Sequence, residues 1–314
     1  MKTTDIIIYH ADCVDGMAAA WVARSAVLDK RPVTNLKLVP MHYNDKFDFG
    51  LLADVTGGPI HIHILDFSLP IGDLIALHNA SNFDSLTYID HHPTGEIPLL
   101  AAEQRFRGAL PGEVSCIFGT GPGVSGASLA WKHYFGVLAI PRGIMRVADR
   151  DTWTFGYTDS KNFHAFAALF LTKPYMWDGV FEDCNFESAV ASGEAVRMHM
   201  DDIATKYAAA DRWQRIKYND VDGAFLNINR EHVSDVSEKI LELNPDIKFV
   251  ICFQVKPTTI KFDFRSRNGE GLFNCGEVAK LFGGGGHVGA GGVEVEKSGA
   301  HYHALASLFG LYLS

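Results

Sequence analysis

The chain has 314 residues, of which 47% are hydrophobic and 21% are charged, and its formal net charge is −9. This length suits one large or two ordinary domains, and this composition is typical of soluble globular proteins. No stretch approaches the roughly 20 consecutive apolar residues of a membrane-spanning helix, so we expect no membrane partner. Because long duplex DNA is held mainly through neutralised phosphates, the acidic balance argues against it and favours small or short anionic ligands.

The N-terminal segment and the cysteines both indicate a reducing compartment. Asp5 and Asp12 appear before any long apolar stretch forms, so the segment lacks the layout of a signal peptide and we expect a cytoplasmic protein. The five cysteines are scattered along the chain and form no C-x-x-C pair. This spacing argues against a disulfide framework and against a zinc knuckle.

The first half of the chain alternates apolar strands with helical patterns. Strands are predicted over 5–10, 35–40, 59–66 and 85–90, and helices over 16–28, 69–79, 125–135 and 141–153. Continuous β-branched runs separated by helices are typical of βαβ units with a parallel sheet.

The pattern changes in the second half. A long helix is predicted over 186–212, and the strand-like runs GAFLNIN, IKFVICFQV and TIKFDFRS follow it. We therefore predict an α/β protein in three parts. These are a parallel-sheet domain with flanking helices at 1–185, a connecting helix at 186–214 and a smaller mixed α/β domain at 215–314.

Acidic and histidine side chains follow three of the predicted parallel strands. They are His10, Asp12 and Asp15 after the first strand, Asp66 after the third, and Asp90, His91 and His92 after the fourth. The ligand crevice of an open parallel sheet lies outside the carboxyl ends of its strands, so we expect these side chains to converge. Asp149 and Asp151, near the end of the predicted helix 141–153, are candidates to complete the cluster.

Converging carboxylates repel one another unless a cation lies between them. Mixed carboxylate and imidazole ligands suit Mn²⁺, Fe²⁺, Co²⁺ or Zn²⁺ better than Ca²⁺, and this many ligands indicates two ions. A pair about 3.5–4 Å apart can activate water and clamp a phosphoryl group. For Asp66 alone, helix capping and metal binding are about equally expected. Because the adjacent His91 and His92 also follow a strand end, beside Asp90, we favour metal binding over helix capping for the whole cluster.

Five motifs, in order along the chain, resemble those of the DHH phosphoesterase superfamily. YIDHHP resembles the motif that names the superfamily, YHADCVDGMAAAW the first motif, ILDFS the second and RVADRDTW the fourth. The segment FRSRNGEGLFNCGEVAKLFGGGGHVGAGGVEV resembles the signature of the accompanying DHHA1 domain. The motifs span residues 10 to about 295. The resemblance implies a DHH domain followed by a smaller DHHA1 domain.

The resemblance also implies roles for residues at matching positions. Asp66 would bridge two metal ions, and its catalytic partners would be Asp90 and His92, which would support the ligands or touch the substrate. The remaining metal ligands would be His10 at the first ion and Asp15, His91 and Asp149 at the second, with Asp151 as the alternative to Asp149. Two Mn²⁺ ions are expected, with Mg²⁺, Co²⁺ or Zn²⁺ as alternatives.

The first motif departs from the family pattern. The more familiar motif ends in Asp-x-Asp, whereas this chain has Cys13-Val14-Asp15. Either the Cys13 thiolate binds a softer metal, or Asp12 takes the vacant role, or the first site is weakly held. A buried cysteine that acts as a small hydrophobic residue is a further alternative. We favour Asp12 as the ligand because it keeps the carboxylate chemistry.

The glycine-rich block 283–286 precedes His287 and is not a Walker loop, because no Gly-Lys-Ser/Thr follows. Consecutive glycines let backbone N–H groups approach a phosphate, and His287 and Arg265 can donate further hydrogen bonds. A flexible linker is the alternative, but the block lies between a predicted helix and the strand GVEVE. The predicted substrate-binding residues are Arg265, Ser266, Gly284, Gly285, Gly286 and His287.

The resulting hypothesis is a divalent-metal-dependent phosphoesterase that hydrolyses short oligonucleotides or small nucleotides, as an oligoribonuclease would, by a two-metal mechanism. One alternative is a RecJ-like single-strand exonuclease, which would need a basic groove that the net charge does not promise. Another is a catalytically decayed DHH scaffold protein. A homodimer is compatible with the sequence.

Overall fold

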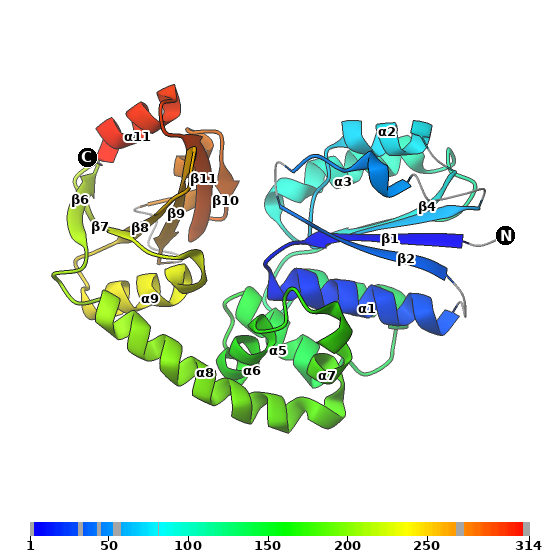
Figure 1. Cartoon of the computed structure of the whole chain (residues 1–314), viewed down its shortest axis with the longest axis horizontal. Coiled ribbons are helices and arrows are strands. Elements are labelled where there is room, and N and C mark those ends of the chain that lie inside the picture. Colours follow the sequence, from blue (N-terminus) through cyan, green and yellow to red (C-terminus); the bar gives the residue numbers. More distant parts are fainter. Residues whose placement is uncertain are drawn as a thin grey trace. The chain divides into compact units, whose positions relative to one another are not determined.

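The structure is a computed structural model that describes residues 3–30, 34–42, 45–52, 58–80, 82–267 and 273–309. The chain forms two compact units, Met1–Arg197 and Met198–Ser314 (Figure 1). The predicted division into parts at 1–185, 186–214 and 215–314 stays a prediction. One continuous helix, α8 (Phe186–Tyr207), runs from the first unit into the second. Within the described ranges, no helix combines the length and the apolar character that a membrane crossing requires.

The first unit is built on a parallel sheet, as the sequence predicted. Its strands lie in the order β2-β1-β3-β4-β5, and every pairing is parallel. Their bounds are β1 Thr3–His10, β2 Thr34–Met41, β3 Ile60–Leu65, β4 Phe83–Asp90 and β5 Val114–Phe118. The chain winds outward from β1 to β2 and then returns to β3 on the other side of β1. The carboxyl ends of β1 and β3 therefore form the switch point where α/β proteins bind ligands.

Helices cover both faces of this sheet (Figure 1). On one face lie α2 (Ile71–Ala80) and α3 (Glu96–Phe106), and on the other lie α1 (Val14–Lys30) and α4 (Gly126–Phe135). Alternate residues of β1 enter different cores: Ile6 and Ile8 pack with α2 and α3, while Ile7 and Tyr9 pack with α1 and α4. Burial on both sides explains why this strand is a continuous apolar run rather than an alternating one.

Further helices of the first unit follow α4. They are α5 (Arg142–Asp151), α6 (Ser160–Ala168), α7 (Trp177–Phe181) and the start of α8. Helix α5 ends two residues before its predicted end. The next turn places Trp153 at φ 58°, a left-handed conformation that no helix can continue through.

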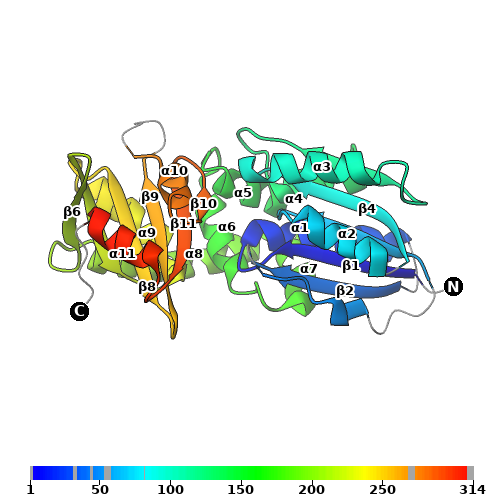
Figure 2. The ribbon, with the colours of Figure 1, turned by 90° about the horizontal axis from the view of Figure 1, so that it is seen from above.

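The second unit contains a mixed sheet, which confirms the predicted α/β class. The strand order is β10-β11-β9-β8-β7-β6, with β7 and β8 parallel and the other neighbours antiparallel. Their bounds are β6 Gln214–Tyr218, β7 Val221–Asn227, β8 Phe249–Val255, β9 Thr259–Ser266, β10 Gly285–Gly286 and β11 Ala290–Glu296. Helices α10 (Cys275–Lys280) and α11 (Ala300–Phe309) pack in the core of one face, and α9 (Val233–Leu243) packs in the core of the other. Figure 2 shows α10 beside β10 and β11.

Candidate metal centre

Side chains that follow three strands of the first unit meet at one point. Asp66 comes directly after β3, and its carboxylate lies 3.2 Å from His91 Nε2 and 3.7 Å from His10 Nδ1. His10 is the last residue of β1, and His91 is the first residue after β4. The imidazoles of His10 and His91 both lie against this carboxylate. Residues far apart in the sequence therefore converge at the carboxyl ends of neighbouring strands.

The carboxylate of Asp66 has an unusual environment. Its side chain is 1% exposed, and both oxygens accept no hydrogen bond from the part of the chain that the structure describes. The backbone of Asp66 adopts φ 53°, and its N–H donates to Ile89 O at 2.9 Å. Left-handed backbone outside glycine clusters at functional sites, where the surrounding structure over-determines it. A buried charge without hydrogen bonds is costly unless a cation lies against it.

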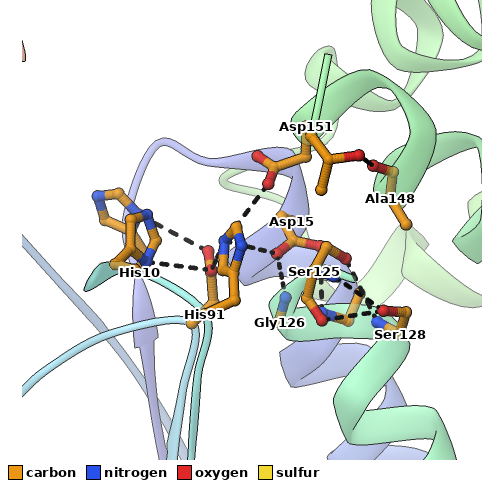
Figure 3. Close-up of polar contacts among 12 residues, drawn as sticks. His10, Asp15, His91, Ser125, Gly126, Ser128, Ala148 and Asp151 are labelled. Carbon is orange, nitrogen blue, oxygen red and sulfur yellow. Dashed lines mark hydrogen bonds and ion pairs between the residues drawn. The ribbon is translucent and has the colours of Figure 1, made fainter. Parts of the chain in front are cut away.

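Asp15, in the first turn of α1, contributes a second acidic group. It accepts hydrogen bonds from Ser125 Oγ at 2.7 Å, Gly126 N at 2.7 Å and Ala127 N at 3.1 Å (Figure 3). Its Oδ2 also lies 3.8 Å from His91 Nε2. The N-terminus of α4 therefore fixes this carboxylate in place, and the positive end of the helix dipole partly compensates its charge.

Gly126 lets α4 come this close. A Cβ at this position would lie 2.6 Å from Asp66 Cβ and 3.0 Å from Asp15 Oδ2. A larger residue would push the helix away from both carboxylates. Ser125 and Gly126 were not predicted as site residues. The SGAS run that contains them has the serine of a helix N-cap, and in the structure Ser125 forms a capping box with Ser128.

Two acids of α5 were candidates for the same role, and the structure separates them. Asp151 Oδ2 lies 3.3 Å from His91 Nε2 (Figure 3). Asp149 instead accepts hydrogen bonds from Gly156 N at 2.7 Å, Tyr157 N at 3.2 Å and Ser160 Oγ, and so anchors the following loop. Because a helix has about 3.6 residues per turn, side chains two positions apart point about 200° apart. The structure therefore places Asp151 in the cluster and Asp149 outside it.

Asp90 and His92 form a supporting pair. Asp90 is buried, and its Oδ1 accepts from His92 Nδ1 at 2.8 Å and from the backbone N–H groups of His91 and His92. Its Oδ2 accepts from Ser68 Oγ at 2.6 Å. With these bonds Asp90 orients its neighbours, and His92 Nδ1 lies 3.8 Å from Asp66. Asp90 thus acts on the cluster through His92 and His91.

Asp12 and Cys13 point in different directions. The backbone of Asp12 adopts φ 52°, and its half-exposed carboxylate lies 3.5 Å from His42 Nε2. Cys13 instead lies with His10 and Asp66, so that one ligand-type atom from each is within 4.8 Å of the others. Asp12 belongs to no such group among the described residues.

Burial and mutual charge shift the pKa values of the cluster in opposite directions. Burial disfavours the charged form of Asp66, but the imidazoles of His10 and His91 outweigh it and hold the pKa of Asp66 well below its usual range. For His91, burial opposes protonation, while Asp66, Asp15 and Asp151 raise the pKa to about 10. Burial and the charges of Asp66 and Asp151 raise the pKa of Asp15. Several buried carboxylates therefore surround His91, an arrangement that favours positive charge at this point.

The substrate-binding residues predicted in the second unit are engaged mostly within that unit. Ser266 Oγ donates to Phe273 O at 2.9 Å, and Gly284 N donates to Ala279 O at 2.9 Å. Gly285 and Gly286 form β10 and pair with β11. Arg265 Nη1 donates to Phe264 O at 2.9 Å. The side chain of His287 is exposed, while its N–H donates to Ala290 O at 2.7 Å.

Comparison with known proteins identifies the fold. No protein-family model matches the chain. The uncharacterised protein R106 of Acanthamoeba polyphaga mimivirus is 23% identical over 299 residues, which cover 92% of this chain and 67% of the relative. A solved structure of the exonuclease RecJ bound to manganese aligns with a TM-score of 0.54 and 13% identity, over 98% of this chain and 89% of that one. The DHH domain structure of PF0399, described as a member of a family of ribosomal proteins, aligns with a TM-score of 0.50 and 13% identity, over 99% and 87%.

This chain has the fold of a DHH-domain protein. The resemblance inferred from the five motifs is thus confirmed at the level of the fold.

The acidic and histidine side chains of this site could hold divalent metal. Within the described ranges, three overlapping groups of side chains could each hold an ion: His10–Cys13–Asp66, Asp66–His91–His92 and Asp15–His91–Asp151. The two oxygens of Asp66 and the Nε2 of His91 are buried without a hydrogen-bond partner among these residues, as expected of atoms reserved for a metal.

Proposed function

We propose that this DHH protein is a divalent-metal-dependent phosphoesterase that hydrolyses short oligonucleotides or small nucleotides. The observation that carries the proposal is the position of Asp66. Its buried carboxylate belongs to two of the ligand groups, one with His10 and Cys13 and the other with His91 and His92. A carboxylate shared between two groups of ligands is the arrangement that a bridged pair of ions requires.

The residues of the site would have distinct roles. Asp66 would hold both ions, His10 would complete the first site, and Asp15, His91 and Asp151 would complete the second. A bound pair supplies activated water and positive charge for the phosphoryl oxygens. Asp90 would keep the Nδ1–H of His92 engaged, so that Nε2 is the nitrogen of His92 available to a ligand or to the substrate.

The expected size of the substrate rests on the net charge of the chain and on the candidate phosphate-binding residues of the second unit. The net charge of −9 disfavours tracking along many phosphates, whereas a single phosphate can be held by a local group of donors. Arg265 and the exposed imidazole of His287 are the candidates for that group in the second unit. Mn²⁺ is the first ion to test, because imidazole and carboxylate ligands suit it.

The decisive experiment combines metal analysis with a substrate panel. Metal-free protein is loaded with Mn²⁺ and assayed on pApA, a five-nucleotide RNA, a cyclic dinucleotide, a nucleoside bisphosphate and pyrophosphate. We expect hydrolysis of at least one nucleotide, none in the absence of divalent metal, and a loss of about 1,000-fold or more in Asp66→Asn. A protein that binds a divalent metal yet cleaves no phosphoester would instead be a scaffold.

Salt dependence separates the proposed enzyme from a processive single-strand exonuclease. Activity on a short substrate should change little with ionic strength, because few phosphates are neutralised. A steep loss of activity on long single strands with rising salt, together with a preference for them, would favour the exonuclease.

A further inference from the structure

The side chain of Cys13 occupies the position where the first DHH motif usually carries a carboxylate. Its sulfur lies with a ring nitrogen of His10 and a carboxylate oxygen of Asp66, each within 4.8 Å of the others. Ligand atoms around one tetrahedral ion are about 3.5 Å apart, so movements of roughly 1 Å would close the group. The residue as a whole is partly buried, and the hydrophobic cores of the described first unit do not include it.

A second observation points to a ligand at the same place. The carboxylate of Asp66 is 1% exposed, and neither of its oxygens accepts a hydrogen bond within the described chain. This buried acceptor faces His10 and belongs to the same group as Cys13. A buried carboxylate that accepts no hydrogen bond and lies next to an imidazole and a thiol is a donor set suited to a cation.

The neighbouring acid offers no substitute. Asp12 lies one residue before Cys13, but its left-handed backbone directs the carboxylate toward His42, 3.5 Å away. A helix begins immediately afterwards at Val14, so the two side chains leave the turn in different directions. The preference for Asp12 inferred from the sequence therefore does not match the geometry.

We infer that Cys13 is a thiolate ligand of the first metal ion, with His10 and Asp66, and that this ion is a thiophilic one such as Zn²⁺, Co²⁺ or Fe²⁺. The inference rests on the proposed function, since it assigns one ligand and one class of ion to that same centre. On binding, the thiol loses its proton to solvent and a metal–sulfur bond forms. Thiolate ligands select zinc and other soft ions, whereas Mn²⁺ prefers oxygen, so the two sites of the centre differ in preference.

Cys13 also borders a cavity of the first unit. This cavity of about 320 Å³ is lined by Tyr9, Asp12, Cys13, Met17, Leu38 and His42, among others.

Cobalt spectroscopy tests the inference without measuring activity. Metal-free protein is titrated with Co²⁺, and the near-ultraviolet sulfur-to-cobalt charge-transfer absorption is recorded together with the amount of bound Co²⁺. We expect the absorption in the wild type and in Cys184→Ser, which replaces an exposed cysteine. In Cys13→Ser the absorption should vanish, and Zn²⁺ affinity should fall by at least the 10- to 100-fold that loss of an outer partner costs.

Two further variants complete the design. Cys13→Asp should lose the charge-transfer absorption and shift its preference from Zn²⁺ toward Mn²⁺. Asp12→Asn, which keeps a residue that tolerates left-handed backbone, should keep the absorption. Wild-type protein that binds Co²⁺ without the absorption would overturn the cysteine ligand and leave the proposed phosphoesterase intact. A charge-transfer absorption that survives in Cys13→Ser would also overturn Cys13 as the ligand. Protein that binds no divalent ion would overturn both.

Discussion

The side chains around Asp66 in the first unit and the glycine block 283–286 in the second unit are both candidate sites. They are built in opposite ways. At the cluster, side chains from three strand ends and two helices converge on Asp66, and close backbone approach is confined to glycines that border them, such as Gly126. At the glycine block, backbones converge instead. A Cβ on Gly284 would lie 2.2 Å from Gly292 O, and one on Gly276 would lie 2.5 Å from Gly286 O.

The difference teaches where each region is sensitive to mutation. The cluster depends on the chemical identity of side chains, so conservative replacements there should change metal binding while the fold survives. The glycine block depends on the absence of side chains, so adding a methyl group there should disturb the fold of the second unit. Variants in the two regions should therefore differ in whether they lose metal binding or stability.

The largest effect is expected for Asp66→Asn. Asparagine keeps the volume and tolerates the left-handed backbone of this position, but it cannot bridge two cations. We expect hydrolysis to fall by about 1,000-fold or more, comparable to removing a central electrostatic group from an enzyme. In the wild type, saturating metal at about 100 times its Kd should stabilise the fold by about 2.7 kcal/mol. Thermal unfolding with and without metal checks whether the variant has lost this increment.

The metal-free variant supplies the control for that experiment. Asp66→Asn should unfold close to the wild-type temperature when both proteins lack metal, because its backbone hydrogen bond to Ile89 O is retained. A large drop in the metal-free protein would mean that Asp66 holds the fold rather than the ions.

Gly286→Ala should produce the largest loss of stability. Gly286 adopts φ 144°, and a Cβ there would lie 2.3 Å from Ala290 O and 2.5 Å from Gly291 Cα. Strained backbone and overpacking together cost on the order of 3 kcal/mol. Hydrogen exchange should show faster opening of β10 and β11, while metal affinity in the first unit stays close to that of the wild type.

The adjacent glycine provides a matched control. For a Cβ on Gly285, no described atom lies within 4 Å, and the position has no left-handed backbone. Gly285→Ala should therefore stay within about 0.5 kcal/mol of the wild type, as surface substitutions usually do. Equal destabilisation by the two variants would show that the block does not depend on close backbone approach.

Much of the cluster could be predicted from the sequence, because it follows from a rule about parallel strands. His10, Asp66 and His91 each follow a clear apolar run, and the carboxyl ends of neighbouring parallel strands must lie together. Strand β5 was missed because VSCIF is only five residues long and lies half-buried at the edge of the sheet, where the apolar pattern is weakest.

The details that were not predictable depend on single dihedral angles. Asp149 and Asp151 differ only in their phase on one helix, and the end of α5 had to be known to within two residues to choose between them. Asp12 is itself a left-handed residue and Cys13 follows it directly, so one dihedral angle decides which of the two side chains faces His10 and Asp66. Hydrophobic patterns fix which strand ends meet, but they do not fix the direction of a side chain in the turn that follows.

A moderate effect is expected for Asp90→Asn. Asp90 Oδ1 accepts hydrogen bonds from both the backbone and the ring of His92, and Oδ2 accepts from Ser68, so an amide would replace one of these two acceptors with a donor. Loss of such an orienting partner typically weakens metal binding 10- to 100-fold. Isothermal titration with Mn²⁺ checks this value. Ser68→Ala removes only the bond to the other oxygen and should have a smaller effect. If the two variants were equally impaired, the orientation of His92 would not be the cause.

The smallest effect is expected for His287→Ala, and it tests the glycine block as a binding site. The N–H of residue 287 donates to Ala290 O, so the alanine variant should keep the backbone in place. Loss of one hydrogen bond to a phosphate costs about 1.5–3 kcal/mol, which corresponds to a rise in KM of about tenfold or more with kcat nearly unchanged. His303→Ala, which replaces another exposed histidine of the same unit, should leave KM unchanged. Equal falls in kcat and kcat/KM would place His287 at the transition state, and unchanged kinetics would mean that the glycine block has a structural role only.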